Sequence, residues 1–214
     1  MNKNSFEAEL LHTPFDKEDA YHSLSMPVYN TAAYEFDTAE AMEEAFCGRT
    51  ADHAYSRITN PTVQYFEKRI QTITGALSVT ALNSGMAAIS NIFFTLAQAG
   101  ANIVTSAHLF GNTYSFFKST LAAFGVEVRF CDLTNPEAVR AQVDENTCAV
   151  FLEVITNPQL EVADLKVLSG IAHQIGAPLI ADTTVVPFHI FHANEFGVDI
   201  EIVSSTKYLS LIHI

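Results

Sequence analysis

The sequence has few basic residues and no long apolar run. Lysine and arginine number 11 against 24 aspartates and glutamates, which gives a formal net charge of −13 at pH 7. A general nucleic-acid surface or a surface for anionic membranes needs an excess of positive charge, so this balance argues against both partners. No stretch approaches the roughly 18 uninterrupted apolar residues of a membrane span. Residues 1–11 are polar and acidic, unlike the basic and then apolar start of a secretory signal.

Cysteine is also scarce, and the common nucleotide-binding motifs are missing. Cys47, Cys131 and Cys148 are scattered without CxxC spacing, which favours free thiols in a reducing compartment and predicts a cytoplasmic protein. His189 and His192 lie three residues apart with no third ligand nearby, so we expect no metal site. Neither GxGxxG nor GxxxxGK[ST] occurs, which removes the strongest sequence support for dinucleotide or nucleoside-triphosphate binding.

The chain reads as an arm followed by one α/β domain. Its 214 residues are 49 % apolar, enough for a sizeable core. Residues 1–59 lack recurrent strand-like runs and carry one clear helix, with Asp37 and Glu40 as a candidate capping box and Gly48 as its end. A second helix should begin at Asn60-Pro61 and end at Gly75. We therefore predict an arm over residues 1–59 and a large domain over residues 60–214.

From residue 76 onward, short β-branched runs alternate with helical segments, which is typical of a mainly parallel sheet with crossover helices. The predicted strands are 77–82, 101–106, 127–131, 149–155, 178–181 and 199–203. The predicted helices between them are 85–98, 112–124, 136–143 and 164–175.

Ligands of open parallel sheets bind beyond the carboxyl ends of the strands. Ser84-Gly85-Met86 follows one predicted strand and opens a helix, so its backbone N–H groups could face an anion. Taken alone this signal is weak, because glycine is also common in such turns for backbone reasons. Lys207, with hydroxyl neighbours at another strand end, must have its charge neutralised, paired or used chemically.

One chemical use of Lys207 is a Schiff base with the aldehyde of pyridoxal phosphate, whose pyridine nitrogen is commonly paired with an aspartate. Asp182, one strand earlier, could supply that carboxylate. A solvated lysine and a helix-capping Asp182 explain the spacing equally well, and both interpretations stay open at this point.

The order and spacing of the strand-end motifs resemble the cystathionine γ-synthase family, also called the Cys/Met-metabolism pyridoxal-phosphate enzymes. The resemblance covers residues from about Ser25 to Tyr208. It rests on YSRITNPT from Tyr55, SGMAAI from Ser84, FGNTY from Phe110, Asn157-Pro158, ADTT from Ala181 and SSTKY from Ser204. It implies the large domain of the aspartate-aminotransferase fold (pyridoxal-phosphate fold type I).

The resemblance also implies roles for individual residues. Lys207 would hold the cofactor and move protons between substrate carbons. Asp182 would pair with the pyridine nitrogen, Phe110 would stack on the ring, and Asn157 would lie near the phenolic oxygen. The remaining cofactor-binding residues, mostly around the phosphate, would be Ser84, Gly85, Met86, Thr184, Ser204 and Thr206, joined by Tyr55 and Arg57 from a neighbouring subunit.

Within the family the chain looks most like the O-acetylhomoserine sulfhydrylases, judging by MPVY from Met26 and the FGNTY loop from Phe110. This implies replacement of acetate on O-acetylhomoserine by sulfide or a thiol, giving homocysteine or methionine. Cystathionine γ-synthase and cystathionine or methionine γ-lyase remain alternatives. Phe110 stands where many relatives have tyrosine, which weakens the lyase interpretation because a hydroxyl that can assist departure of the leaving group is missing. Thr183 replaces a common asparagine, a change that we expect to be tolerated.

Relatives continue beyond the lysine into a small C-terminal domain that carries the arginine for the substrate carboxylate. Here the chain stops six residues after Tyr208, and it differs from the family from about Leu211. An inactive truncated fragment is therefore a further alternative. The family suggests a homo-oligomer, a dimer of dimers, for an intact protein.

Overall fold

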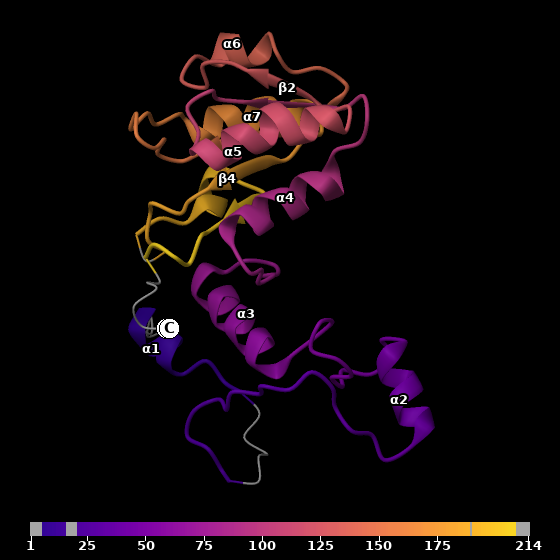
Figure 1. The fold of residues 1–214 in the computed structure, drawn as a ribbon. Helices are drawn as coiled ribbons and strands as arrows, with labels where there is room; N and C mark the ends of the chain where they lie inside the picture. The colour runs from indigo at the N-terminus through magenta and orange to yellow at the C-terminus, as the bar shows by residue number, and fades with distance from the viewer. Residues whose placement is uncertain (1–5, 16–20, 189, 209–214) are drawn as a thin grey trace. The chain divides into compact units, whose positions relative to one another are not determined.

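We analysed a computed structural model of the chain, in which residues 6–15, 21–188 and 190–208 are described (Figure 1). His189 and the tail from Leu211, which the sequence analysis discussed, lie outside the described residues. The chain divides into two compact units, residues 1–81 and residues 82–214, and each is described by itself. None of the helices in the described part has the length and apolar character needed to cross a membrane.

The first unit contains three helices, α1 (Phe6–Leu11), α2 (Ala39–Phe46) and α3 (Pro61–Thr74). Helix α1 was not predicted. The prediction of an Asp37–Glu40 capping box is wrong, because Thr38 is the N-cap and its hydroxyl accepts from Ala41 N at 3.1 Å. The ends predicted for α3 are confirmed. Asn60 caps its start, and Gly75 follows its last turn with φ of 68°, a left-handed conformation that favours glycine.

The strand predicted for residues 77–82 does not form. Leu77 is 98 % exposed, and its carbonyl accepts a hydrogen bond from the side chain of Gln71 at 2.8 Å. The backbone N–H of Ala81 donates to Glu67 Oε1 at 2.7 Å. Side chains of α3 therefore satisfy backbone groups that a neighbouring strand would otherwise pair.

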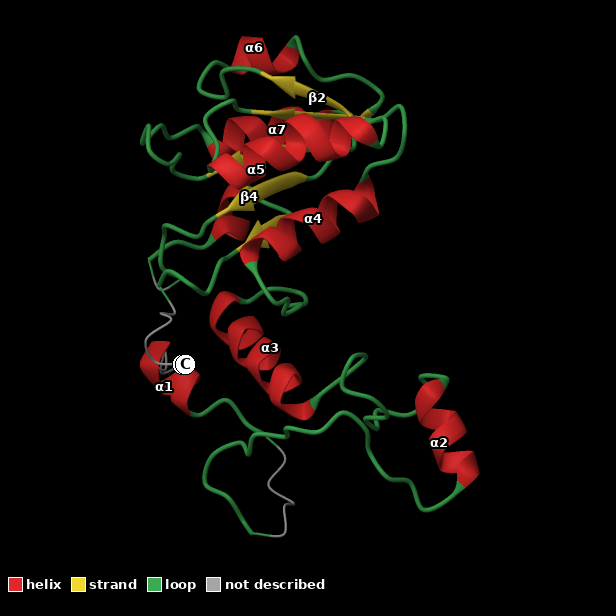
Figure 2. Ribbon diagram, viewed as in Figure 1, coloured by secondary structure: helices red, strands yellow, loops and turns green. Residues whose placement is uncertain are grey.

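The second unit is built on a five-stranded sheet in which every pairing is parallel, in the order β2-β1-β3-β4-β5 (Figure 2). The strands are β1 (Asn102–Thr105), β2 (Glu127–Phe130), β3 (Thr147–Glu153), β4 (Leu179–Asp182) and β5 (Ile200–Ile202). Strands alternating with helices produce this arrangement, since parallel neighbours need crossover connections. The predicted α/β class is confirmed.

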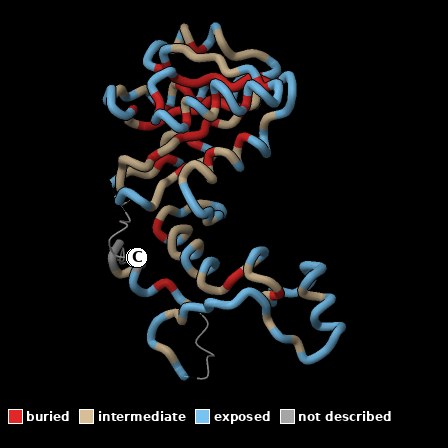
Figure 3. The backbone as a smooth tube through the Cα atoms, viewed as in Figure 1, coloured by how far each residue is buried: buried red, intermediate tan, exposed pale blue. Residues whose placement is uncertain are grey.

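Helices cover both faces of this sheet. Helix α4 (Gly85–Leu96) and the π-helix η1 (Phe116–Leu121), which continues α5 (Gly111–Ser115), pack against one face around Ile103, Phe151 and Ile180. Helices α6 (Pro136–Arg140) and α7 (Leu165–Gln174) cover the other face around Val104 and Val150. Neighbouring strand residues alternate between the two cores, as the pleat of a strand requires. The buried residues of this unit accordingly gather along the sheet (Figure 3).

Most helices in the second unit are shorter than predicted. The regular helix expected over residues 112–124 is instead a short α5 followed by η1, and the helix expected over 136–143 ends at Arg140. The short 3-10 turn η2 (Ala193–Phe196) was not predicted. Apart from the missing strand before Ser84, these differences leave the strand ends that precede Phe110, Asn157 and Ser204 in their predicted order.

Candidate active site

The first turn of α4 presents backbone donors at the carboxyl edge of the sheet. Ser84 is the N-cap. Its hydroxyl accepts from Ala87 N at 3.0 Å, and its carbonyl accepts from Ala88 N at 3.0 Å. Within the part of the chain that the structure describes, the backbone N–H groups of Gly85 and Met86 donate no hydrogen bond. The start of this 12-residue helix therefore keeps two donors and its positive dipole end for an anion.

Gly85 allows the loop after β5 to approach this helix closely. A Cβ atom built on Gly85 would lie 2.9 Å from Ser204 Cβ and 3.3 Å from Ser204 Oγ. Carbon atoms without a bond between them prefer separations of about 3.5–4.0 Å, so a larger residue would push the two segments apart. The glycine that sequence reasoning alone left ambiguous is thus required by packing against a second predicted site residue.

The loops after β4 and β5 are joined through a threonine. The backbone N–H of Thr184 donates to Asp182 Oδ1 at 2.9 Å, and the Thr184 hydroxyl accepts from Ser204 N at 2.8 Å. Burial raises the pKa of the Asp182 carboxyl, while its hydrogen bonds with Thr184 and the positive charge of Lys207 lower it. Asp182 and Lys207 therefore interact electrostatically across this edge. Thr206 and Lys207 themselves are exposed.

Phe110 and Asn157 lie on the loops after β1 and β3, and a buried carboxylate connects them. Glu153, the last residue of β3, accepts from Phe110 N through Oε1 at 2.5 Å and from Asn157 N through Oε2 at 3.2 Å. The residue is 7 % exposed. Sequence reasoning missed Glu153, although a carboxylate that ends an otherwise apolar strand is the signal that could have found it.

Thr183, the residue that departs from the family pattern, is fully buried beside Asp182. Its hydroxyl donates to Glu201 Oε1 at 2.6 Å. The substitution is therefore accommodated by a hydrogen bond to β5.

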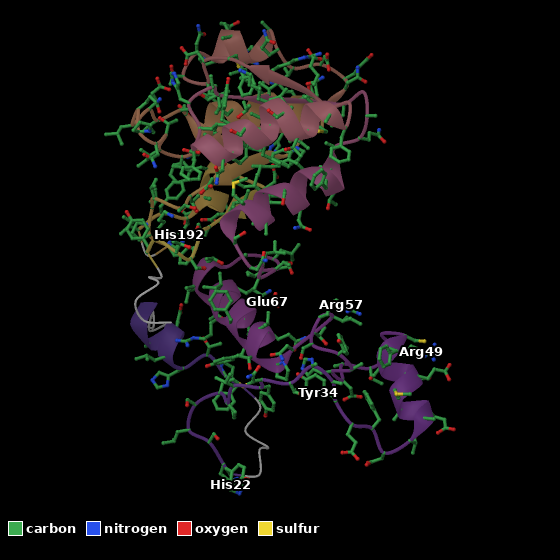
Figure 4. The ribbon with its side chains drawn as sticks, viewed as in Figure 1. His22, Tyr34, Arg49, Arg57, Glu67 and His192 are labelled. Carbon is green, nitrogen blue, oxygen red and sulfur yellow. The ribbon has the colours of Figure 1, made fainter. Side chains whose placement is uncertain are left out.

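Tyr55 and Arg57 belong to the first unit, in which Figure 4 labels Arg57. The Arg57 guanidinium lies 4.8 Å from the centre of the Tyr55 ring. Asn60 fixes the segment that carries them. Its Oδ1 accepts from Thr62 N at 2.9 Å, and its Nδ2 donates to Ser56 Oγ at 2.9 Å. Asn60 thus joins the start of α3 to the Tyr55–Arg57 segment.

The first unit also contains an open hollow of about 470 Å³, lined by α3 and by the segments before and after it. None of the predicted site residues lines it. Glu67 and Gln71 in its lining already bond to Ala81 N and to the Leu77 carbonyl, so these side chains hold the segment after α3.

A family model described as Cys/Met metabolism PLP-dependent enzyme matches residues 7–211. The chain belongs to this family. The resemblance inferred from the motifs is confirmed, and so is pyridoxal phosphate as the cofactor of the family.

The curated relatives that share 36 % identity with the chain include a sulfhydrylase and a gamma-lyase. One is the O-acetyl-L-homoserine sulfhydrylase of Corynebacterium glutamicum, matched over 95 % of this chain and 47 % of the relative. The other is the L-methionine gamma-lyase of Fusobacterium nucleatum, matched over 98 % of this chain and 53 % of the relative. The chain therefore spans about half the length of the curated relatives it matches.

A solved structure described as an O-acetylhomoserine (thiol)-lyase of Campylobacter jejuni is 30 % identical to the chain. It superposes with a TM-score of 0.89 over 95 % of this chain and 48 % of that one. That structure contains an N′-pyridoxyl-lysine-5′-monophosphate residue. The fold predicted from the family resemblance is thereby confirmed.

The residues at the sheet edge fit the cofactor of the family. A phosphate needs several donors, and the first turn of α4 offers the free N–H groups of Gly85 and Met86. A protonated pyridine nitrogen needs a carboxylate, and an aldehyde needs an amine. Asp182 and Lys207 would supply these groups, and the positive charge of Lys207 works against the burial that raises the pKa of Asp182.

Proposed function

We propose that the protein replaces the acetate of O-acetylhomoserine with sulfide or a thiol and so forms homocysteine or methionine. The observation that carries the proposal is the grouping of free helix N–H groups, Asp182 and Lys207 at one sheet edge in a chain of this family. Similarity to a sulfhydrylase over 95 % of the chain supports the choice of substrate.

The proposed roles follow from the chemistry of each residue. When bound, pyridoxal phosphate supplies an electron sink for negative charge that develops on substrate carbons. Lys207 holds the cofactor through its amine and then carries protons between substrate carbons as a general base. Asp182 keeps the pyridine nitrogen protonated by pairing with it.

The remaining residues bind or orient the cofactor. Phe110 would stack on the ring, and Asn157 would lie near the phenolic oxygen. The N–H groups of Gly85 and Met86 would donate to the phosphate. The further contacts that we propose come from Ser84, Thr184, Ser204 and Thr206, and from Tyr55 and Arg57 of a neighbouring subunit in a homo-oligomer. We further propose that residues 1–59 act as an arm that delivers the last two.

Elimination from methionine is a second candidate function, since a methionine gamma-lyase matches the chain with the same 36 % identity. Phe110 favours replacement, because it has no hydroxyl to assist a leaving group. Product analysis distinguishes the two: acetylhomoserine with sulfide yields homocysteine and acetate, whereas elimination from methionine with uptake of water yields methanethiol, a keto acid and ammonia. We also propose that the enzyme is cytoplasmic, because its three cysteines, Cys47, Cys131 and Cys148, are free thiols.

The first test is covalent capture of the cofactor. We would add pyridoxal phosphate to the 214-residue chain, reduce with borohydride and map the modified peptides by mass spectrometry. The proposal predicts stoichiometric label on Lys207 alone, with Lys118 and Lys166 unlabelled as internal controls. Scattered or absent label would show that this chain forms no cofactor site.

A further inference from the structure

Glu153 makes an unusual set of contacts for a buried carboxylate, because both of the hydrogen bonds that it accepts within the described residues come from backbone N–H groups of loops. One donor belongs to the loop after β1, at Phe110, and the other to the loop after β3, at Asn157. These loops leave neighbouring strands that pair in parallel up to Thr105 and Phe151. Beyond that register the sheet no longer fixes their separation, and the side chain of Glu153 spans it.

The geometry requires a group with two acceptors and no donor. An ionised carboxylate offers both oxygens to N–H groups, whereas the amide of glutamine offers one oxygen and turns an N–H₂ group toward the second donor. Hydrogen bonds to an ionised group are also stronger than those between neutral groups. Burying a charge is costly unless such bonds compensate it. Glu153 is only 7 % exposed, and as a carboxylate it accepts two backbone hydrogen bonds, which a neutral glutamine side chain would not do.

The location of Glu153 connects this task to the candidate site. Its register partner on β4 is Asp182, and neighbouring strands lie about 4.7–4.9 Å apart. The two residues that Glu153 holds are those proposed to contact the face and the phenolic oxygen of the cofactor. We propose that Glu153 is a positioning residue, which sets the separation of Phe110 and Asn157 by accepting one backbone hydrogen bond from each. This inference rests on the proposed function, because the separation affects activity only if Phe110 and Asn157 contact the cofactor.

We call the two hydrogen bonds from Phe110 N and Asn157 N to Glu153 the Glu153 bridge. Hydrogen–deuterium exchange of the wild-type chain without cofactor tests this bridge directly. Among the described residues, the N–H groups of Phe110 and Asn157 have no backbone acceptor, so the hydrogen bond that protects each of them is the one to Glu153. We expect both to exchange at least about tenfold more slowly than unbonded amides of comparable exposure, as a hydrogen bond to a charged group implies. Exchange at the unprotected rate for both would overturn the proposal without any variant.

The variant Glu153→Gln leaves one acceptor for two donors, and its matched control is Glu137→Gln on the exposed side of α6. We expect at least one of the two N–H groups to exchange about tenfold faster in Glu153→Gln and neither to change in the control. With pyridoxal phosphate bound, the visible circular dichroism of the cofactor should change in Glu153→Gln only, since the position of Phe110 against the ring changes.

The readouts separate the two proposals. A wild-type chain that captures no cofactor contradicts the proposed function, while its exchange pattern still decides whether the bridge exists. Faster exchange in Glu153→Gln with unchanged cofactor dichroism and affinity would reduce Glu153 to a structural residue and overturn its positioning role. Unchanged exchange in a folded Glu153→Gln chain would overturn the bridge itself.

Discussion

Replacement of Gly85 by alanine tests whether the close approach of α4 and the Ser204 loop is a real packing constraint. The new Cβ would lie 2.9 Å from Ser204 Cβ, about 0.6–1 Å closer than carbon atoms prefer. Overpacking of this kind costs about 1–3 kcal/mol. Alanine is favoured over glycine in the middle of a helix by about 0.5–1 kcal/mol, and Gly85 is the first helical residue, so this gain applies at most in part and the net loss in Gly85→Ala should be about 0–3 kcal/mol.

Ser204→Gly provides the matched background, because it removes the two side-chain atoms that the new methyl group would meet. The nearest remaining atom is the Cα of residue 204, at an ordinary contact distance of 3.5 Å. In that background Gly85→Ala should be neutral or stabilising. The double-mutant cycle should therefore show a coupling of about 1–3 kcal/mol between the two positions.

Thiol labelling in increasing urea measures this coupling in the second unit. Cys131 and Cys148 lie in that unit and are half-buried, and burial raises the pKa of Cys131 to about 11, which keeps the native thiol unreactive. Cys47 is exposed and would be replaced by serine in all four variants. Equal costs of Gly85→Ala in the two backgrounds would refute the packing argument, whatever their size.

Three further predictions concern other parts of the chain. Asn60→Ala should destabilise the first unit by about 2–4 kcal/mol, because it removes a helix cap and leaves acceptors such as the Tyr29 carbonyl without their donor. Asn60→Asp, which keeps the cap, should lose less in urea unfolding followed by circular dichroism. Arg129 and Asn102 hold the pKa of Asp144 down to about 2, so this contribution to stability is complete above pH of about 4 and is lost as the pH falls toward 2. Asp144→Asn should flatten the pH dependence of the urea midpoint over that range, and an unchanged slope would contradict the assignment. Lys207→Ala should abolish borohydride capture of pyridoxal phosphate while ultrafiltration still detects reversible binding; retained capture at another single lysine would show that the reactive amine was misassigned.

The parts of the fold that the sequence predicted are those governed by local rules. Asn60, Pro61 and Gly75 mark both ends of α3 because each satisfies a need specific to a helix terminus. The strand expected over 77–82 failed because its apolar pattern says nothing about Glu67 and Gln71, whose side chains take over its backbone groups. The wide turns of η1 likewise have no local sequence signature.

The candidate site likewise has one part that local sequence motifs predict and another that depends on tertiary contacts. Its motifs identify which residues gather at the sheet edge, since parallel strands all deliver their carboxyl ends to one place. What holds the loops is a set of side-chain acceptors for backbone N–H groups, and these are tertiary contacts. The Thr184–Ser204 link and the Glu153 bridge join segments 20 and 43 residues apart, so no local pattern can reveal them.

Glu153 and Asp182 together explain why a cationic partner suits this edge. They occupy the same register on neighbouring strands, and burial raises the pKa of both carboxyls. A raised folded-state pKa means that ionisation costs stability, and the cost grows as the pH rises from the unfolded value through the folded one. Lys207 offsets part of it at Asp182. A second positive charge beside Asp182, such as a protonated ring nitrogen, would offset more, so binding of that charge and ionisation of Asp182 favour each other. The cost of ionising Asp182 would therefore be reduced by the same positive charge that the proposed function places beside it.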